Sequence, residues 1–509
     1  MIAASSTDPD PTSTPLLRGL ARNPAIPLDV LLQLVQVWPE QACEGLRHRV
    51  QLPMPVQDAM ARHPSRAVRV TLAEHPEVAP QTRARLLDDP EWQVWIRAFG
   101  RPGQQPLPDD VLVRLLTALD ELPAEVPFTS EELIGELFDA MQHERRLFLL
   151  AAGHPQPGIR QFAAGSLDRL DDSSRETLLR DPVPEVRATA KKARAEQRRI
   201  MLPADLPTEH CHAYWWVLQR PLSRALMDQV LASGDVEALH FVATNPSTSP
   251  DVVETLLGHP AAEVRREVAT RADLTNEQLL RLAADPTAEV RTAVSIHPSL
   301  TEQQRSGISI DITTVPGDGH YSARIGCRSA VHYLADESVP RLGDALRWAR
   351  SVNPLLRRRA ARHPELPAPL IPALAADSDL GVRVLLAQNH PKAPPTLLLR
   401  CFLEYDGCGR DRLSSLPYFP ITGLARFATH PDPAVRRLVA LDPHADPRLV
   451  DRMSTDPAIA VRQAVANCPR LPMNRIMALL DDPDLAEYAA ANPALPVQQM
   501  LHILNNHAR

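Results

Sequence analysis

The sequence predicts an all-α solenoid of two-helix repeats, each about 26 residues long, and two regularities carry this prediction. The first is a dipeptide of Asp, His or Asn followed by proline, which recurs at alternating gaps of 12 and 14 residues. A period of about 20 to 50 residues is typical of solenoids, in which each unit buries its apolar face against its neighbours. The clearest prolines are Pro64, Pro76 and Pro90, and later Pro431, Pro443, Pro457, Pro469 and Pro483.

The second regularity places a branched aliphatic residue four positions after the proline that opens the 12-residue half, usually followed by arginine. The best tandem pair runs from His259 to Pro298. We call these arginines the ladder, because residues one repeat apart should lie in one row along the stack. The ladder consists of Arg69, Arg160, Arg187, Arg265, Arg291, Arg383, Arg436 and Arg462.

Each half-repeat is consistent with one short helix. The residue before a proline avoids the helical region and proline suits the first helical position, so a helix is expected to begin at Pro286, with Asp285 capping its first turn. Val290, Ala293 and Val294 then follow at helical spacing and are expected to face the core.

The other half-repeat often carries a further proline three or four residues after the corner, and this proline should start the next helix. The examples are Pro250, Pro367, Pro447, Pro472 and Pro496. Leucine pairs such as Leu256-Leu257 and Leu279-Leu280 supply the expected buried face. Helices of about 8 to 10 residues are marginal alone, so packing within the stack must stabilise them.

The run DPAIAVRQAVANCPRLPMNRIMALLDDP, from Asp456 to Pro483, resembles the leucine-rich repeat variant family of bacterial proteins. The resemblance covers about two thirds of the chain at the level of the repeat. It implies short α and 3₁₀ helices in a right-handed superhelix without strands, and a binding role by analogy. The chain departs from the family in its slightly longer period and in lacking the cysteine-rich iron–sulfur segment of some members.

Breaks in the period predict the domain organisation. Residues 1–15, rich in Ser, Thr, Asp and Pro, are expected to be a disordered tail. The expected repeats span 16–100, 151–195, 243–300, 353–400 and 428–509. The expected interruptions are an irregular helical insertion at 101–150, a divergent spacer at 196–242, an insertion with a small β-hairpin at 301–352 and an irregular segment at 401–427.

Composition and the absence of known motifs argue against several classes of function. The chain has 509 residues, a formal net charge of -7 and only 4% aromatic residues. There is no signal peptide pattern and no apolar run of membrane-spanning length. The 6 scattered cysteines favour a reducing cytoplasm over a disulfide framework. No nucleophile elbow, HExxH, dinucleotide fingerprint or CxxC pair occurs, so we expect neither an enzyme nor a cofactor.

The ladder has two interpretations. An arginine row could bind nucleic-acid phosphates along a concave groove. Alternatively, each arginine could pair with a corner aspartate or with helix carbonyls of a neighbouring repeat. We favour the structural interpretation, because the ladder persists in degenerate copies and the whole chain is acidic. The histidines of the His-Pro dipeptides are likewise interpreted as turn residues.

The irregular segments hold the remaining candidates. Residues 307–326 alternate as a β-hairpin around a Pro-Gly-Asp-Gly turn, and its exposed edge could pair with a partner. The candidate partner-binding residues there are His320, Tyr321, Arg324 and Arg328. Trp215 and Trp216 follow a His-Cys-His run and are expected to belong to the core. Neither that run nor Cys401 with Cys408 has the spacing of a metal site.

Together these observations predict a non-catalytic cytoplasmic scaffold of bacterial type that binds another macromolecule through an extended surface. A protein is the expected partner, and nucleic acid in an arginine-lined groove is the alternative.

Overall fold

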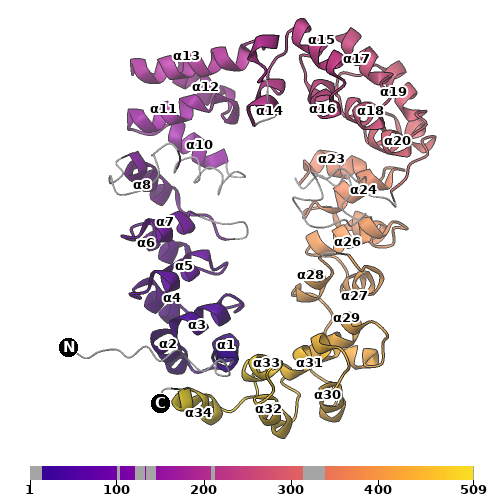
Figure 1. Cartoon of the computed structure of the whole chain (residues 1–509). Helices are drawn as coiled ribbons and strands as arrows, with labels where there is room; N and C mark the ends of the chain where they lie inside the picture. Colours follow the sequence, from indigo (N-terminus) through magenta and orange to yellow (C-terminus); the bar gives the residue numbers. More distant parts are fainter. Residues whose placement is uncertain are drawn as a thin grey trace. The chain divides into compact units, whose positions relative to one another are not determined.

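The computed structural model describes residues 14–99, 104–120, 132, 145–207, 212–312, 339–407 and 409–507. These residues are helical throughout, with short 3₁₀ helices among the α-helices and no strand (Figure 1). Only an isolated bridge pairs Met201 with Leu222. The chain divides into two compact units, residues 1–195 with 421–509 and residues 196–420.

The first unit combines both ends of the chain. Its helices before the division are α1 (Thr14–Arg22), α2 (Leu28–Val37), α3 (Pro39–Leu46), α4 (Met54–Ala61), α5 (Arg66–Glu74), α6 (Pro80–Leu86), α7 (Trp92–Ala98), α8 (Asp109–Asp120), α10 (Arg145–Ala152), α11 (Pro157–Gly165), η1 (Leu167–Arg169), α12 (Asp172–Leu179) and α13 (Pro184–Arg198). Those after it are η5 (Leu424–Phe427), α29 (Pro433–Arg436), η6 (Arg437–Leu441), α30 (Pro447–Met453), α31 (Ile459–Ala466), α32 (Met473–Leu479), α33 (Ala486–Ala490) and α34 (Val497–His507).

The second unit begins with helices that hold the expected spacer. Its elements are η2 (Pro203–Asp205), α14 (His212–Leu218), α15 (Arg224–Ser233), α16 (Val236–Thr244), α17 (Pro250–Leu257), α18 (Ala262–Val268), α19 (Asn276–Ala283), α20 (Ala288–Ser295), α21 (Glu302–Ser306), α23 (Leu342–Trp348), α24 (Pro354–Ala361), η4 (Ala368–Leu370), α25 (Ile371–Ala375), α26 (Leu380–Asn389), α27 (Pro395–Glu404) and α28 (Arg410–Ser415).

Each repeat has a first helix and a second helix, and these form two rows. In the second unit α15, α17 and α19 are first helices, whereas α16, α18 and α20 are second helices and lie along the other row (Figure 1). We call the turn before each second helix the entry corner and the turn after it the exit corner. First helices α17 and α30 begin with proline, as the sequence predicts. Helices α32 and α34 instead begin one residue after Pro472 and Pro496.

Second helices begin later than expected. Helix α20 starts at Ala288, two residues after Pro286. Asp285 instead accepts a hydrogen bond from the backbone N–H of Thr287 at 2.8 Å, which forms a turn within the entry corner. The Asp-Pro pair therefore shapes the corner, and the helix follows it.

The core lies between the two helix rows. Val264, Val268, Val290 and Val294 from successive second helices are fully buried in one cluster, which confirms the predicted inward face. Of the Leu279-Leu280 pair only the first is buried, because adjacent residues on a helix point about 100° apart.

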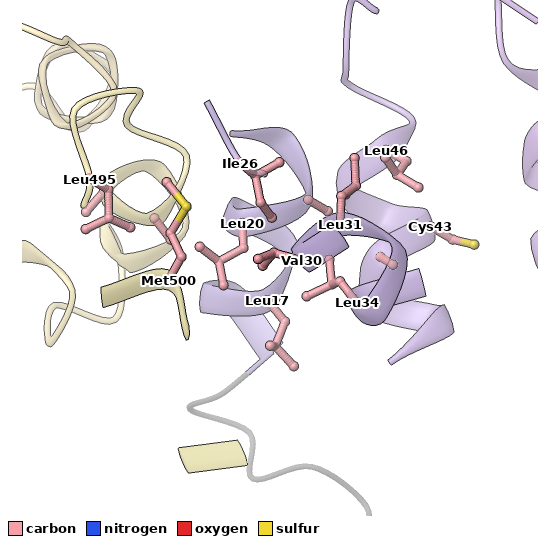
Figure 2. Close-up of a cluster of buried hydrophobic side chains, with 14 of the residues drawn as sticks. Leu17, Leu20, Ile26, Val30, Leu31, Leu34, Cys43, Leu46, Leu495 and Met500 are labelled. Atoms are coloured by element: carbon pink, nitrogen blue, oxygen red, sulfur yellow. The ribbon is translucent and has the colours of Figure 1, made fainter. Parts of the chain in front are cut away.

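The ends of the described chain pack together inside the first unit. Helix α1 lies against α33, and Leu495 and Met500 join the apolar cluster that contains Leu17 and Leu20 (Figure 2). We call this contact the seam. A Cβ atom at Gly19 would overlap with the carbonyl oxygen of Glu487, so the helices meet at backbone distance.

The expected β-hairpin is not supported. Residues 307–312 form no strand, and 313–326 lie outside the described residues. Ser309 and Asp311 are held instead by their backbone bonds to side chains of α20: the Ser309 carbonyl accepts from Arg291 at 2.8 Å, and the Asp311 N–H donates to Thr292 at 3.0 Å. Among the described residues, no helix has both the length and the apolar character needed to cross a membrane.

Candidate functional site: two corner rows and an aromatic surface

The ladder arginines join neighbouring repeats at the entry corners. Arg265 donates from Nε and Nη2 to both carboxylate oxygens of Asp285 in the next repeat, at 2.7 and 3.0 Å. Its Nη1 also donates to the carbonyls of His259 and Pro260 in its own corner. The two side chains are only 11% and 7% exposed. Each such arginine therefore ties its own corner to the next one with a two-pronged, charge-assisted contact.

The same arrangement recurs in both units. The equivalent arginine–aspartate pairs are Arg69 with Asp89, Arg160 with Asp181, Arg357 with Asp377 and Arg436 with Asp456. Arg357 was missed by the sequence pattern because its corner reads Ser-Val, without the usual Asp-Pro or His-Pro. Its carbonyl bonds to Ser351 and Val352 have the same geometry as in the other corners.

The other ladder arginines keep the carbonyl contacts but differ at the next repeat. Arg383 pairs with Glu404 at 2.5 Å, and Arg291 donates to the Ser309 carbonyl. Among the described residues, Arg187 and Arg462 donate hydrogen bonds only to the carbonyls of their own corners. The contact common to every ladder arginine is therefore the one that holds its own corner.

Pairing with the ladder arginines lowers the pKa values of the corner aspartates. The Arg160 and Arg436 guanidinium groups lower the pKa of Asp181 and Asp456 through the side-chain hydrogen bonds, and the ladder contacts also hold these carboxylates ionised. Desolvation opposes this at Asp285, yet the pKa of that carboxyl is also lowered, because Arg265 and the Thr287 N–H stabilise its charge.

The corner histidines serve as turn acceptors. His75, His297 and His390 each accept at Nδ1 a hydrogen bond from the backbone N–H two residues later, at 3.1 to 3.2 Å. An accepting Nδ1 leaves the proton on Nε2, which donates to a carbonyl of the preceding repeat. For His297 this carbonyl belongs to Arg271, at 2.7 Å. Histidine thus replaces Asn or Asp at these corners by offering the same acceptor.

Exit corners are joined by bonds to backbone carbonyls. Asn245 donates from Nδ2 to the carbonyls of Leu218 and Arg220, at 2.8 and 2.7 Å. Arg271, one repeat later, donates from Nη1 to the carbonyls of Ala243 and Asn245, at 3.0 and 2.8 Å. Asn, Arg and His can alternate in this row because each supplies an N–H to the buried carbonyls of the previous corner.

The exit-corner row continues across the seam. Asn492 donates to Ala466 and Cys468, and Asn23 donates in the same way to the carbonyls of Ala490 and Asn492, at 2.9 and 2.7 Å. The last described repeat therefore occupies the position of a preceding repeat for the first one. Arg22 adds an ion pair to Glu487 at 2.8 Å.

A cluster of aromatic rings lies on the second-helix row of the second unit. We define the aromatic surface as Trp215, Trp216, His240 and Phe241, from α14 and α16. Counted back from the exit corner, Trp216 and Phe241 hold one position in successive helices, and Trp215 and His240 hold the position before it. The rings of Trp215 and Phe241 stack with centroids 5.0 Å apart.

The two tryptophans differ in burial. Trp215 packs against the core, as predicted, whereas Trp216 is 49% exposed, which corrects the expectation that both belong to the core. Arg220 lies over the Trp216 ring at 4.4 Å, and His240 lies 3.4 Å from Glu267 of α18. Rigid rings beside charged groups of both signs are typical of residues that anchor protein–protein interfaces.

Several predicted residues cannot be placed. His320, Tyr321, Arg324 and Arg328 lie outside the described residues, as do Cys211 and Cys408. In the part of the chain that the structure describes, no group of three His, Cys, Asp or Glu side chains has the arrangement of a metal site. Cys401 is buried, and burial raises the pKa of its thiol to about 12, so this thiol is not a reactive nucleophile.

Comparison with known proteins gives only distant structural likenesses. No protein-family model matches the chain, and no curated protein matches it. A crystal structure of a Kap121p mutant aligns with 97% of this chain and 52% of its own, at 12% identity and a TM-score of 0.23. A crystal structure of an engineered protein aligns over 99% of this chain and 97% of its own, at 13% identity and a TM-score of 0.12. The chain therefore spans about half the length of the Kap121p chain.

Proposed function

We propose that the chain is a non-catalytic cytoplasmic scaffold that binds another protein through its second-helix row. The observation that carries this proposal is the internal use of the ladder. Arg69, Arg160 and Arg265 direct their guanidinium groups to carboxylates and carbonyls of the protein itself. A phosphate backbone would have to compete with those buried partners, so the ladder gives little support to the nucleic-acid alternative.

The aromatic surface supports a protein partner more directly. Aromatic residues make up only 4% of the sequence, yet α14 and α16 place two tryptophans, a phenylalanine and a histidine in adjacent positions. Interface hot spots are enriched in Trp, Tyr and Arg, and Trp216 with Arg220 supplies two of these types. We further propose membership of the leucine-rich repeat variant family and a bacterial origin, on the strength of the repeat motif.

Affinity capture with the full-length protein tests this function. Trp216→Ala should lose specific protein partners that the wild-type chain retains, as identified by mass spectrometry. Leu280→Ala is the matched control, because this leucine is 46% exposed on a first helix of the same unit and should leave the partners unchanged. Circular dichroism should show equal helicity for all three proteins.

The alternative is tested by titrating mixed-sequence duplex DNA and single-stranded RNA at two salt concentrations. We expect no binding that weakens steeply with salt. Strong salt-dependent binding that is lost in an Arg265→Gln, Arg291→Gln variant of unchanged stability would overturn the proposal.

A further inference from the structure

The exit corner at Arg49 differs from its counterpart at Arg271. Both arginines donate from Nη1 to carbonyls of the preceding exit corner, Arg49 to Ala21 and Asn23 at 3.1 and 2.7 Å. Arg271 also donates from Nε and Nη2 to the carboxylate of Asp273, at 2.9 and 2.7 Å. Its charge is therefore neutralised two residues along its own chain.

Arg49 lacks that carboxylate. The residue equivalent to Asp273 is Gln51, and Arg49 Nε donates to the Gln51 backbone carbonyl at 2.9 Å. Within the described residues Arg49 pairs with no carboxylate, and its Nη2 has no acceptor. Burial lowers the pKa of Arg49, as expected for a cation that is partly desolvated without a counter-charge.

This unpaired cation lines a pocket of about 400 Å³ at the seam. Arg22 and His48 add cationic or protonatable groups, and Arg22 is the only one of the three with a carboxylate partner among the described residues. Apolar surface borders the cations: Pro493 lines the same pocket, and Val50 is 81% exposed.

A row of exposed apolar side chains, here called the apolar row, lies on the first helices near the seam. The first helices that follow the exit corners near the seam begin with exposed apolar side chains at one equivalent position, immediately after a proline. These residues are Met473, Val497, Leu28 and Met54. In repeats farther from the seam this first helical position holds a proline, as at Pro80, Pro250 and Pro447. The repeats on both sides of the seam therefore expose large apolar side chains at this position.

We propose that the seam pocket binds an acidic peptide segment of a partner protein, whose carboxylate meets Arg49 as Asp273 meets Arg271, with apolar neighbours of the carboxylate on Val50 and the apolar row. The proposal rests on the proposed function, since it specifies the partner chemistry for a second surface. The Arg271–Asp273 contact supplies the template, because the same corner in the same protein is completed by a carboxylate.

Selection from a random heptapeptide library on the immobilised full-length protein tests the pocket. We expect enriched peptides to place Asp or Glu beside Leu, Ile, Val or Phe. In the best peptide, replacing the acid by its amide should weaken binding about tenfold or more, as loss of a charge-assisted contact predicts. Enrichment without acidic residues, or equal binding of the acid and amide peptides, would overturn the proposal.

Two variants locate the site. Gln51→Asp should place a carboxylate on Arg49 and weaken the peptide about tenfold or more without loss of thermal stability, so the result cannot be ascribed to unfolding. Trp216→Ala should leave the peptide affinity unchanged. Peptide binding that survives Gln51→Asp rejects the pocket even when Trp216→Ala still loses cellular partners, in which case the proposed function stands. Conversely, peptide binding that is lost in Gln51→Asp supports the pocket even if Trp216→Ala changes no partner.

Discussion

The entry and exit corners join the same repeats by different chemistry. At the entry corner a largely buried arginine meets an aspartate of the next repeat, as Arg265 meets Asp285. At the exit corner an uncharged amide or imidazole usually meets backbone carbonyls, as Asn245 meets Leu218 and Arg220. One edge of the stack therefore depends on paired charges, and the other depends on hydrogen-bonded backbone groups.

This comparison also explains which substitutions the repeats accept. An ion pair with little exposure needs both partners, because removal of one leaves the other charge desolvated. The exit corner requires only an N–H donor, and for the turn an acceptor, so Asn and His interchange there along the chain. Substitutions at Asp285 and at Asn245 should therefore disrupt the two edges separately.

The largest effect is expected at the entry corner. Asp285→Asn keeps the acceptor for the Thr287 N–H but removes the charge that Arg265 faces. We expect a loss of about 3 kcal/mol in the free energy of unfolding, measured by urea denaturation. Arg291→Gln should cost less, because Arg291 contacts carbonyls only and leaves no carboxylate behind. Equal losses for the two variants would refute the role assigned to the buried pair.

Breaking the exit corner should cost somewhat less. Asn245→Ala removes the donor to two carbonyls and the acceptor for the Ser247 N–H, and leaves these buried groups unpaired. We expect a loss of about 2 kcal/mol by the same measurement. Asn245→His should restore most of it, since His297 makes the equivalent contacts. A histidine variant as unstable as the alanine variant would show that the corner needs the amide itself.

The two edges should also respond differently to mild acid. Burial lowers the pKa of His75 and His390, so the folded protein favours their neutral, accepting form. The unfolded chain then binds more protons below about pH 6.5, and stability should fall as the pH is lowered from there toward the folded pKa. The loss is about 1.4 kcal/mol for each unit of pKa lowering.

Replacing both histidines by Asn tests this assignment. Asn supplies the same turn acceptor without titrating, so the pH dependence of urea unfolding between about pH 6.5 and 5 should flatten. The carboxylates of the entry corners have lowered pKa values and lose their contribution only as the pH falls through those lower values. An unchanged pH profile in the double variant would exclude His75 and His390 as its source.

The smallest effect is expected where the exit corner lacks its counter-charge. Gln51→Asp should raise the unfolding free energy by about 0.5 kcal/mol, because Arg49 gains a partly exposed ion pair. Asp273→Gln should lower it by a similar amount. Urea denaturation of the two single variants would reveal this symmetry, and changes of the same sign would contradict the equivalence of the two corners.

The repeat, its helical composition and its buried valines were predictable from the sequence, because the proline spacing and the Val-Arg pair report local turns and a helical face. The internal use of arginine was preferred because the ladder persists in degenerate copies of an acidic chain, but the partner of each arginine could not be read from the pattern alone. Arg357 escaped notice because its corner lacks proline, and Leu280 was wrongly placed in the core because composition does not fix helix rotation.

The exit-corner row and the seam were not predictable. Asn23 can bond to the carbonyls of any preceding repeat, so no local signal identifies Asn492 as its partner. The aromatic surface offered a partial signal in the adjacent tryptophans, but the contribution of Phe241 depends on its stacking with Trp215 from the preceding repeat. The predicted patch around Tyr321 lies beyond the described residues and stays a prediction.

The seam has a consequence for self-association. A head-to-tail contact between identical copies normally propagates, whereas here the complementary faces of α1 and α33 meet within one chain. If the contact opened, Leu17, Leu20 and Met500 would lose their cover, and the same faces could join one copy to the next. The equilibrium between single chains and linear polymers would then depend on protein concentration, and the Arg22–Glu487 ion pair and the close approach at Gly19 would set the concentration at which polymers form.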